Sequence, residues 1–402
     1  MKITIVNQPL NNRGDQAAHR AFVRELSKVF FNDNVNIVFL NREQEYIDKI
    51  ADQSISVSYV NVTGFHKAIN KAEKISLKSN FWTLSYIHPV LRKYINTIKS
   101  SDLVICAPGG ICMGGFMDWS HVWQLWVAKK LNKKIIYWGR SIGPFTDEDK
   151  EHSLFKKRSY ELIKYFQYIS MRDNISYELA KSINLNTVKA IDSAFLETPR
   201  AEIDERLKKE IGDKYVVFVP NELKWHYKFK DIDSEKIMDF YLDIIKALFE
   251  LYPGHKIVML PQLYCSDIAD YKYFLKIKEK VNSDDVVVVD ESYDSDQQQT
   301  IISGAKFLVG GRYHSIIFAI NNCIPFVSLT YEHKMSGLLE MLGLSNYQID
   351  INDVFKTEDT SEFIEKIKSI SKENKNLEKE NKLAKDIVNE AYEKMVEVIK
   401  ER

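Results

Sequence analysis

Short apolar runs recur along the chain, and each is followed by a polar turn and then by a stretch with helical spacing. The runs are of strand length and continuous rather than alternating, as in ITIV near residue 3, VVFV near residue 216 and FLVG near residue 307. A strand that is apolar at every position is buried on both faces, which is typical of a mostly parallel sheet covered by helices. The pattern therefore predicts an α/β protein with doubly wound, Rossmann-like sheets.

The series of strands has too many members for one sheet, and it is interrupted after DSAF, where the sequence turns polar. A new series begins at YVVFVP. We therefore predict an N-terminal Rossmann-like domain over residues 1–197, a C-terminal one over 198–355, and a C-terminal helical segment over 356–402. Lysine and glutamate dominate this segment, which favours a solvated helix along the surface. Functional loops are expected at the carboxyl ends of the strands, where the two domains face a cleft.

The amino-acid composition argues against several classes of protein. Among the 402 residues, Lys plus Arg and Asp plus Glu both number 56, and this balance argues against a general nucleic-acid-binding protein. No apolar run approaches the ~20 residues of a membrane span, and the N-terminus lacks the apolar core of a signal peptide. The 4 cysteines have no metal-like spacing. We expect a cytoplasmic protein with reduced thiols, no metal and no cofactor.

The first candidate site is NNRGDQA, directly after the first strand. Gly14 allows a close backbone approach, and Asp15 can cap the helix that follows. A plain turn with a helix cap is one interpretation. The other is a site for a hydroxyl-bearing ligand, which suits Asn12 and Asp15 better than a phosphate does, because a carboxylate repels a phosphate.

Three more loops follow strands in the N-terminal half. PGGICMGGF, which contains Gly110, is rich in glycine but lacks the GKS or GKT ending of a P-loop. Arg140 emerges at the end of a strand in YWGRSIGPF. Arg172 ends the strand in SMRDN, where Asp173 can cap the next helix. The alternative for Arg140 is a surface arginine in an ordinary loop. Arg172 either pairs with Asp173 as part of the structure or is directed into the cleft.

The strongest candidate is GGRYH at residues 310–314, where a strand meets a helix. A helix start offers free N–H groups and a partial positive charge, and Gly311 lets the backbone approach a ligand. Arg312 can hold a carboxylate or phosphate with two parallel hydrogen bonds, and His314 can transfer a proton near neutral pH. Lys334, after the next strand, can add a second cation. The pattern indicates an anion site with an acid–base residue beside it.

Six of these segments occur together in an order that resembles the polysaccharide pyruvyl transferases. They are the NRGD turn, PGGICMGGF, GRSIGPF, SMRDNIS, DSAF, and GGRYH with the following IPFVSLTYEHK and LGL. The resemblance spans about residues 3–344. Two segments depart from the family pattern, because Arg140-Ser141 replaces a Gln-Gly pair in GRSIGPF and Ser193 replaces proline in DSAF.

The resemblance implies a fold similar to the GT-B glycosyltransferases and the transfer of a pyruvyl group from phosphoenolpyruvate to two hydroxyls of a sugar. The product is a pyruvate ketal on a cell-surface polysaccharide or its lipid-linked precursor, and phosphate is released. We expect His314 and Arg312 to be catalytic. Phosphoenolpyruvate is expected to bind Arg312, Arg172, Lys334 and Gly311, and the acceptor to bind Asn12, Asp15 and Gly110.

Two other functions fit the same pattern. A GT-B glycosyltransferase with a nucleotide-sugar donor would also need a cationic site, together with an acidic contact to the ribose, for which Glu332 and Glu340 are the candidates. A non-catalytic carbohydrate-binding protein could retain the fold. The family also implies peripheral membrane association at the inner face of the cell membrane. Several aromatic residues could contact sugar or membrane, but we expect them in the core: Phe81, Trp82, Phe116, Trp119 and Trp123.

Overall fold

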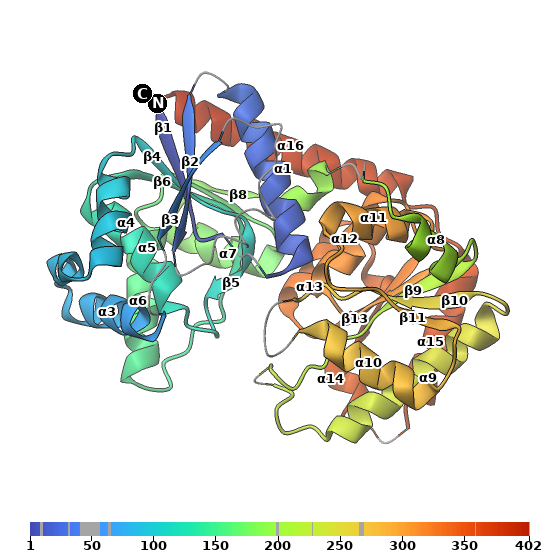
Figure 1. Ribbon diagram of the computed structural model, residues 1–402. Helices are drawn as coiled ribbons and strands as arrows, with labels where there is room; N and C mark the ends of the chain where they lie inside the picture. The colour runs from blue at the N-terminus through green and yellow to red at the C-terminus, as the bar shows by residue number, and fades with distance from the viewer. Residues whose placement is uncertain are drawn as a thin grey trace. The chain divides into compact units, whose positions relative to one another are not determined.

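The structure, a computed structural model, is drawn in Figure 1. It describes residues 1–8, 11–30, 33–40, 57–62, 66–197, 201–226, 228–264, 269–357 and 359–401. Cys265 and the side chain of Trp82 lie outside the described part.

The chain forms two compact units. The first contains Met1–Leu10, Ala18–Leu196 and Asp386–Arg402, and the second contains Asn11–Ala17 and Glu197–Lys385. The predicted division after residue 197 lies next to this one. Two segments are placed differently from the prediction. Asn11–Ala17 belongs to the second unit, and the predicted separate segment 356–402 is divided between the two units.

The first unit is built on a parallel sheet with the strand order β3-β2-β1-β4-β6-β7-β8, and β5 pairs with β6. The register sets Ile3 of β1 beside Val35 on one side and Leu103 on the other. Its elements are β1 (Lys2–Val6), most of α1 (Arg13–Val29), β2 (Asn34–Leu40), β3 (Val57–Val62), α3 (His66–Ser79), η1 (Trp82–Ile87), α4 (Pro89–Lys99), β4 (Leu103–Cys106), β5 (Gly109–Met113), α5 (Trp119–Lys130), β6 (Lys134–Ile142), α6 (Lys150–Ile163), β7 (Tyr168–Met171), α7 (Asn174–Ile183), β8 (Thr187–Lys189) and η2 (Ser193–Leu196).

The second unit has a parallel sheet with the order β11-β10-β9-β12-β13-β14. In chain order this is 3-2-1-4-5-6, the doubly wound arrangement, with its switch point between β9 and β12. The elements are α8 (Glu205–Ile211), β9 (Tyr215–Val219), α9 (Ser234–Leu251), β10 (Lys256–Met259), α10 (Asp270–Val281), β11 (Val286–Val288), α11 (Ser295–Ser303), β12 (Leu308–Gly310), α12 (Tyr313–Asn321), β13 (Phe326–Thr330), α13 (His333–Met341), η3 (Ser345–Tyr347), β14 (Gln348–Asp350), α14 (Ile351–Val354), α15 (Ser361–Glu373) and the start of α16 (Glu378–Lys400). The predicted fold class is confirmed.

Aspartate caps fix several helix starts. Asp173 accepts a hydrogen bond from the Ser176 N–H at 2.8 Å, as predicted. The start of α1 differs from the prediction. The side chain of Asn12, not Asp15, accepts from the backbone N–H groups of Gly14 and Asp15, at 2.9 and 3.2 Å. The helix therefore begins at Arg13, and the Asp15 carboxylate is left for other contacts.

Two short elements of the first unit follow from local contacts. The chain does not stay extended after β8, because Asp192 accepts from the Ala194 N–H at 2.9 Å and DSAF turns into η2. The glycine-rich loop contains a short strand, β5, beside β6.

The predicted C-terminal helix is present as α16, but one of its faces is buried and the others are exposed. Val388, Ala391 and Met395 are buried, and the Trp138 ring lies 5.7 Å from that of Tyr392, edge to face. This half of α16 thus contributes to the core of the first unit. No described helix combines the length and apolar composition needed to cross a bilayer.

Candidate active site

The predicted residues of the second unit lie at the carboxyl ends of β9, β10, β12 and β13. The GGRYH loop follows β12 at the switch point of the sheet, where doubly wound proteins bind their ligands. The Gly311 N–H donates to the Val219 carbonyl at 2.7 Å, which joins this loop to the end of β9. A Cβ atom on Gly310 would overlap the Ser315 hydroxyl, so the tight turn into α12 requires glycine there.

Arg312 is the buried cation of this edge. It is 6% exposed, and one arm of its guanidinium forms an ion pair with Asp270 at the start of α10. The other Asp270 oxygen accepts from the backbone N–H groups of Gln262 and Leu263, at 3.0 and 2.9 Å. Among the described residues, Nε of Arg312 has no hydrogen-bond partner. The guanidinium is therefore held in place with part of its donor capacity unused.

His314 lies against the first turn of α1. Its Nε2 is 3.9 Å from the Asp15 carboxylate, and the ring is almost fully buried. A Cβ atom on Gly14 would overlap this ring. The two motifs that the sequence places 300 residues apart, NRGD and GGRYH, therefore form one site, in which Gly14 makes room for His314.

Backbone hydrogen bonds attach the NRGD turn to the loop after β10. The Arg13 N–H donates to the Gln262 carbonyl at 2.8 Å, and the Tyr264 N–H donates to the Asn11 carbonyl at 3.0 Å. The Arg13 guanidinium stacks on the Tyr264 ring, 3.8 Å from its centroid. The predicted N-terminal domain, residues 1–197, included Asn12 and Asp15, whereas in the structure this turn belongs to the second unit.

Lys334 is held by Glu332, the residue that precedes α13. Its ammonium lies 2.6 Å from one Glu332 oxygen, and the His226 ring lies 3.2 Å from the other. Burial alone would raise the pKa of Glu332, but Lys334 and His226 hold it well below its usual range. Glu332 is thus an ionised carboxylate that positions a cation and an imidazole.

The two cations lie near the same tyrosine. Burial and Glu332 raise the pKa of Tyr331, while Lys334 and Arg312 oppose the rise. Both cations are thus within electrostatic reach of one ring. The Arg312 guanidinium is also 5.7 Å from the centroid of Trp225, which belongs to the loop after β9.

The arginines of the first unit have different surroundings. Arg140 is buried and donates from Nε to the Ala107 carbonyl at 2.6 Å, and from one arm to the Gly110 carbonyl and the Cys112 sulfur at 3.3 and 3.2 Å. The other arm donates to the Asn7 carbonyl. Arg140 thus stabilises the glycine-rich segment through hydrogen bonds to its backbone and to Cys112.

Arg172, predicted to bind the donor, is 1% exposed and forms an ion pair with Asp192, which is fully buried. It belongs to the first unit, whereas Arg312 and Lys334 belong to the second. Its part in donor binding stays a prediction. Gly110 has open space where a side chain would be, and its contact with the acceptor also stays a prediction.

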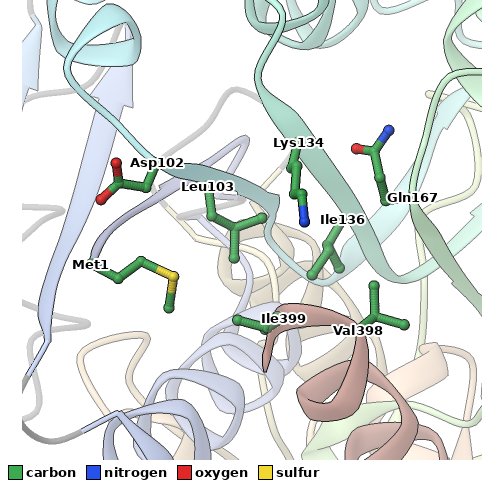
Figure 2. A pocket seen from close by; sticks show the side chains of 8 residues that line it. All are labelled: Met1, Asp102, Leu103, Lys134, Ile136, Gln167, Val398 and Ile399. Atoms are coloured by element: carbon green, nitrogen blue, oxygen red, sulfur yellow. The ribbon is translucent and has the colours of Figure 1, made fainter. Parts of the chain in front are cut away.

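A cavity of about 470 Å³ lies at the opposite edge of the first sheet (Figure 2). Its lining comes from the amino ends of the strands and from the end of α16, and includes Met1, Leu103, Lys134 and Ile399. None of the predicted site residues reaches it. Among the described residues, no group of three or more His, Cys, Asp or Glu is placed to hold a metal ion.

Residues 12–333 match the family described as polysaccharide pyruvyl transferase. The amylovoran biosynthesis protein AmsJ of Erwinia amylovora is 22% identical over 387 residues, which cover 88% of this chain and 89% of AmsJ.

Solved structures share the fold at low sequence identity. The UDP-GlcNAc 2-epimerase of Neisseria meningitidis superposes with a TM-score of 0.61 at 12% identity over 100% of both chains. The spinosyn rhamnosyltransferase SpnG superposes with a TM-score of 0.55 at 11% identity, over 98% of this chain and 96% of SpnG. These likenesses support the GT-B-like architecture, and the family match covers most of the sequence. The chain therefore belongs to the polysaccharide pyruvyl transferase family of enzymes.

Proposed function

We propose that the protein transfers a pyruvyl group from phosphoenolpyruvate to two hydroxyls of a sugar in an extracellular polysaccharide or its lipid-linked precursor. Phosphoenolpyruvate binds at the carboxyl edge of the second sheet. The observation that carries this proposal is the junction of Arg312 and His314 with the NRGD turn. It sets a preoriented cation, an imidazole and a helix start at one switch point.

Donor binding uses the charges already fixed there. Phosphoenolpyruvate carries a carboxylate and a phosphate close together, and burying such charges requires partners. Arg312 takes one of these groups with its unused donors, and Lys334 takes the other. Their carboxylates, Asp270 and Glu332, hold the cations in place before the donor arrives, so little reorganisation is needed.

His314 moves the proton. In its protonated form it donates to the methylene carbon of the donor, and positive charge develops at the former enol carbon. Asp15, 3.9 Å from Nε2, is close enough to attract the charge of the imidazolium. This gives Asp15 a role beside the acid, in place of the acceptor contact expected from the sequence.

The rest of the reaction balances without another reactant. A first sugar hydroxyl adds to the enol carbon, and its proton returns to His314. The carbon–oxygen bond to phosphate then breaks, and Arg312 and Lys334 stabilise the charge on the leaving group. The second hydroxyl closes the ketal, and its proton leaves with inorganic phosphate.

The rival donor, a nucleotide sugar, fits less well. Such a donor usually needs an acidic residue for its ribose, and the candidates were Glu332 and Glu340. Glu332 is already bound to Lys334 and His226. Glu340 is exposed near the end of α13, away from the start of that helix.

A test is to incubate the enzyme with phosphoenolpyruvate and a panel of glycosides that have neighbouring or 1,3-related hydroxyl pairs. Phosphorus NMR follows phosphate release, and proton NMR detects the methyl group of the ketal. We expect phosphate and ketal to appear together with at least one glycoside. Consumption of a UDP-, GDP- or CMP-sugar, with phosphoenolpyruvate untouched, would contradict the proposal.

A further inference from the structure

The stretch from α3 to α4 in the first unit is strongly basic. Residues 66–99 contain seven lysines and arginines and one acidic residue, Glu73, although the whole chain is balanced at 56 of each sign. Glu73 is fully buried, and burial raises its pKa to about 8. This stretch therefore concentrates positive charge in a protein whose formal net charge is zero.

The lysines of α3 lie on one face. Lys67, Lys71, Lys74 and Lys78 are spaced by four, three and four residues, which aligns them along one side of a helix. Three are exposed and Lys74 is half-buried. The opposite face, with Ile69 and Leu77, is buried, and α3 packs on α5. Figure 1 shows α3 at the outer margin of the first unit, beside α6.

Large apolar side chains are exposed on α3 and in the segment that follows it. Ile75 on α3 is 47% exposed, Phe81 just after α3 is 59% exposed, and Ile87 at the end of η1 is 77% exposed. The Phe81 N–H donates to the Ser76 carbonyl at 3.2 Å, which turns the chain back against the end of α3. Trp119 and Trp123 are in the core as predicted, whereas Phe81 and also Phe116 are exposed instead.

One carboxylate reduces the positive charge of the lysine face near the end of α3. Glu151 at the start of α6 forms ion pairs with Lys74 and Lys78, the latter at 3.3 Å. Lys67 and Lys71, in the first half of α3, lie further along the same face. Arg92 and Lys93 on α4 are also exposed. The first half of α3 thus keeps its positive charge, because Glu151 pairs with the lysines of the second half.

We propose that the surface formed by α3 and η1, with Lys67, Lys71, Ile75, Phe81 and Ile87, docks the first unit on a membrane that carries anionic lipid. A basic helix face beside exposed apolar side chains is the chemistry of an interfacial site, in which lysines meet phosphate headgroups and apolar side chains enter the acyl boundary. A protein partner would also cover apolar side chains, but the concentration of one sign of charge favours a lipid surface. The inference is independent of the proposed reaction.

Vesicle flotation without substrate tests this inference separately from the chemistry. The full chain is mixed with vesicles of phosphatidylcholine alone or with added phosphatidylglycerol. The Lys67→Glu/Lys71→Glu variant should bind the anionic vesicles roughly 30-fold more weakly or worse, since each lysine near such a surface contributes about a fivefold effect. The Phe81→Ser/Ile87→Ser variant should bind at least roughly tenfold more weakly. Added salt should weaken wild-type binding.

A matched control lies on α10 of the second unit, where Lys272 and Lys276 flank Leu275, which is 41% exposed. The Lys272→Glu/Leu275→Ser/Lys276→Glu variant should bind vesicles like the wild type. Equal loss in this control, or no binding of the wild type to anionic vesicles, would overturn the inference. So would self-association in sedimentation that Phe81→Ser/Ile87→Ser abolishes, because a second copy of the chain would then cover the surface.

Discussion

The carboxyl edges of the two sheets both contain buried arginines, but the arginines are bound differently. In the first unit, the carbonyls of Asn7, Ala107 and Gly110 accept from Arg140, and a buried carboxylate pairs with Arg172. In the second unit, Asp270 pairs with one arm of Arg312, and among the residues that the structure describes Nε of Arg312 has no hydrogen-bond partner. A guanidinium whose donors are already used stabilises its own loop, whereas one with unused donors can bind a ligand. We therefore propose a structural role for the first edge and anion binding for the second.

The largest effect on catalysis is expected at His314. His314→Ala should lower turnover by about 10²–10⁴-fold, the usual cost of a lost acid–base residue, and leave phosphoenolpyruvate binding nearly unchanged. Steady-state phosphate release and calorimetry measure the two quantities. His255, before β10 at the opposite edge of the same sheet, is the matched control, and His255→Ala should be fully active. Full activity of His314→Ala would remove the proton-transfer role.

Gly14 tests whether the NRGD turn positions that histidine. Gly14→Ala should lower turnover nearly as much as His314→Ala, because the new methyl group overlaps the ring. It should also lower the thermal midpoint. In a His314→Gly background the same substitution should cost little stability, since both the ring and the Cβ atom of residue 314 are gone and alanine favours a helix over glycine by about 1 kcal/mol. Equal destabilisation in both backgrounds would show that the two residues are not coupled.

Arg172 tests the structural role of the first edge. Arg172→Met should lower the free energy of unfolding by about 3–5 kcal/mol, because it removes the ion-pair partner of the buried Asp192 carboxylate. The double variant with Asp192→Asn should recover part of this loss. Unfolding can be followed by tryptophan fluorescence, since five of the 6 tryptophans belong to the first unit. A variant that stays stable but no longer binds phosphoenolpyruvate would show that Arg172 binds the donor.

Glu73 provides a smaller effect that depends on pH. Its pKa is raised from 4.5 to about 8, mainly by burial, so the folded protein binds its proton more tightly than the unfolded chain does. Stability from this group is complete below pH 4.5 and is lost as the pH rises toward 8. Glu73→Gln should therefore gain stability over the wild type, by on the order of a few kcal/mol at pH 9 and little at pH 5.

Urea unfolding at the two pH values measures this difference. Glu279→Gln, at an exposed position of α10, is the control and should show no such trend. A constant difference between Glu73→Gln and the wild type at both pH values would contradict the buried, neutral state of Glu73.

The sequence predicted the sheets well because burial on both faces leaves continuous apolar runs such as those of β9 and β12. It also located Arg312 and His314, since both follow a strand that ends in glycine. It could not predict that Gly14 packs on His314, because this depends on which segments meet in space. Asp270, the partner of Arg312, lies 42 residues away along the chain.

The pairing of His226 with Glu332 was not predicted from the sequence. Glu332 was considered only as a ribose contact, and the loop after β9 that contains His226 resembles an ordinary polar turn. Arg172 shows the reverse problem. An arginine at a strand end looks the same in sequence whether it binds a ligand or a buried carboxylate such as Asp192.

Calorimetric titration of phosphoenolpyruvate into the wild type, Arg312→Ala and Arg172→Met tests the central comparison most directly. The account predicts saturable binding to the wild type and to folded Arg172→Met. Binding to Arg312→Ala should be weaker by between about 30-fold and several thousand-fold, the effect of losing a buried charged partner. Unchanged binding to Arg312→Ala, with circular dichroism showing an intact fold, would contradict the placement of the donor at the second sheet.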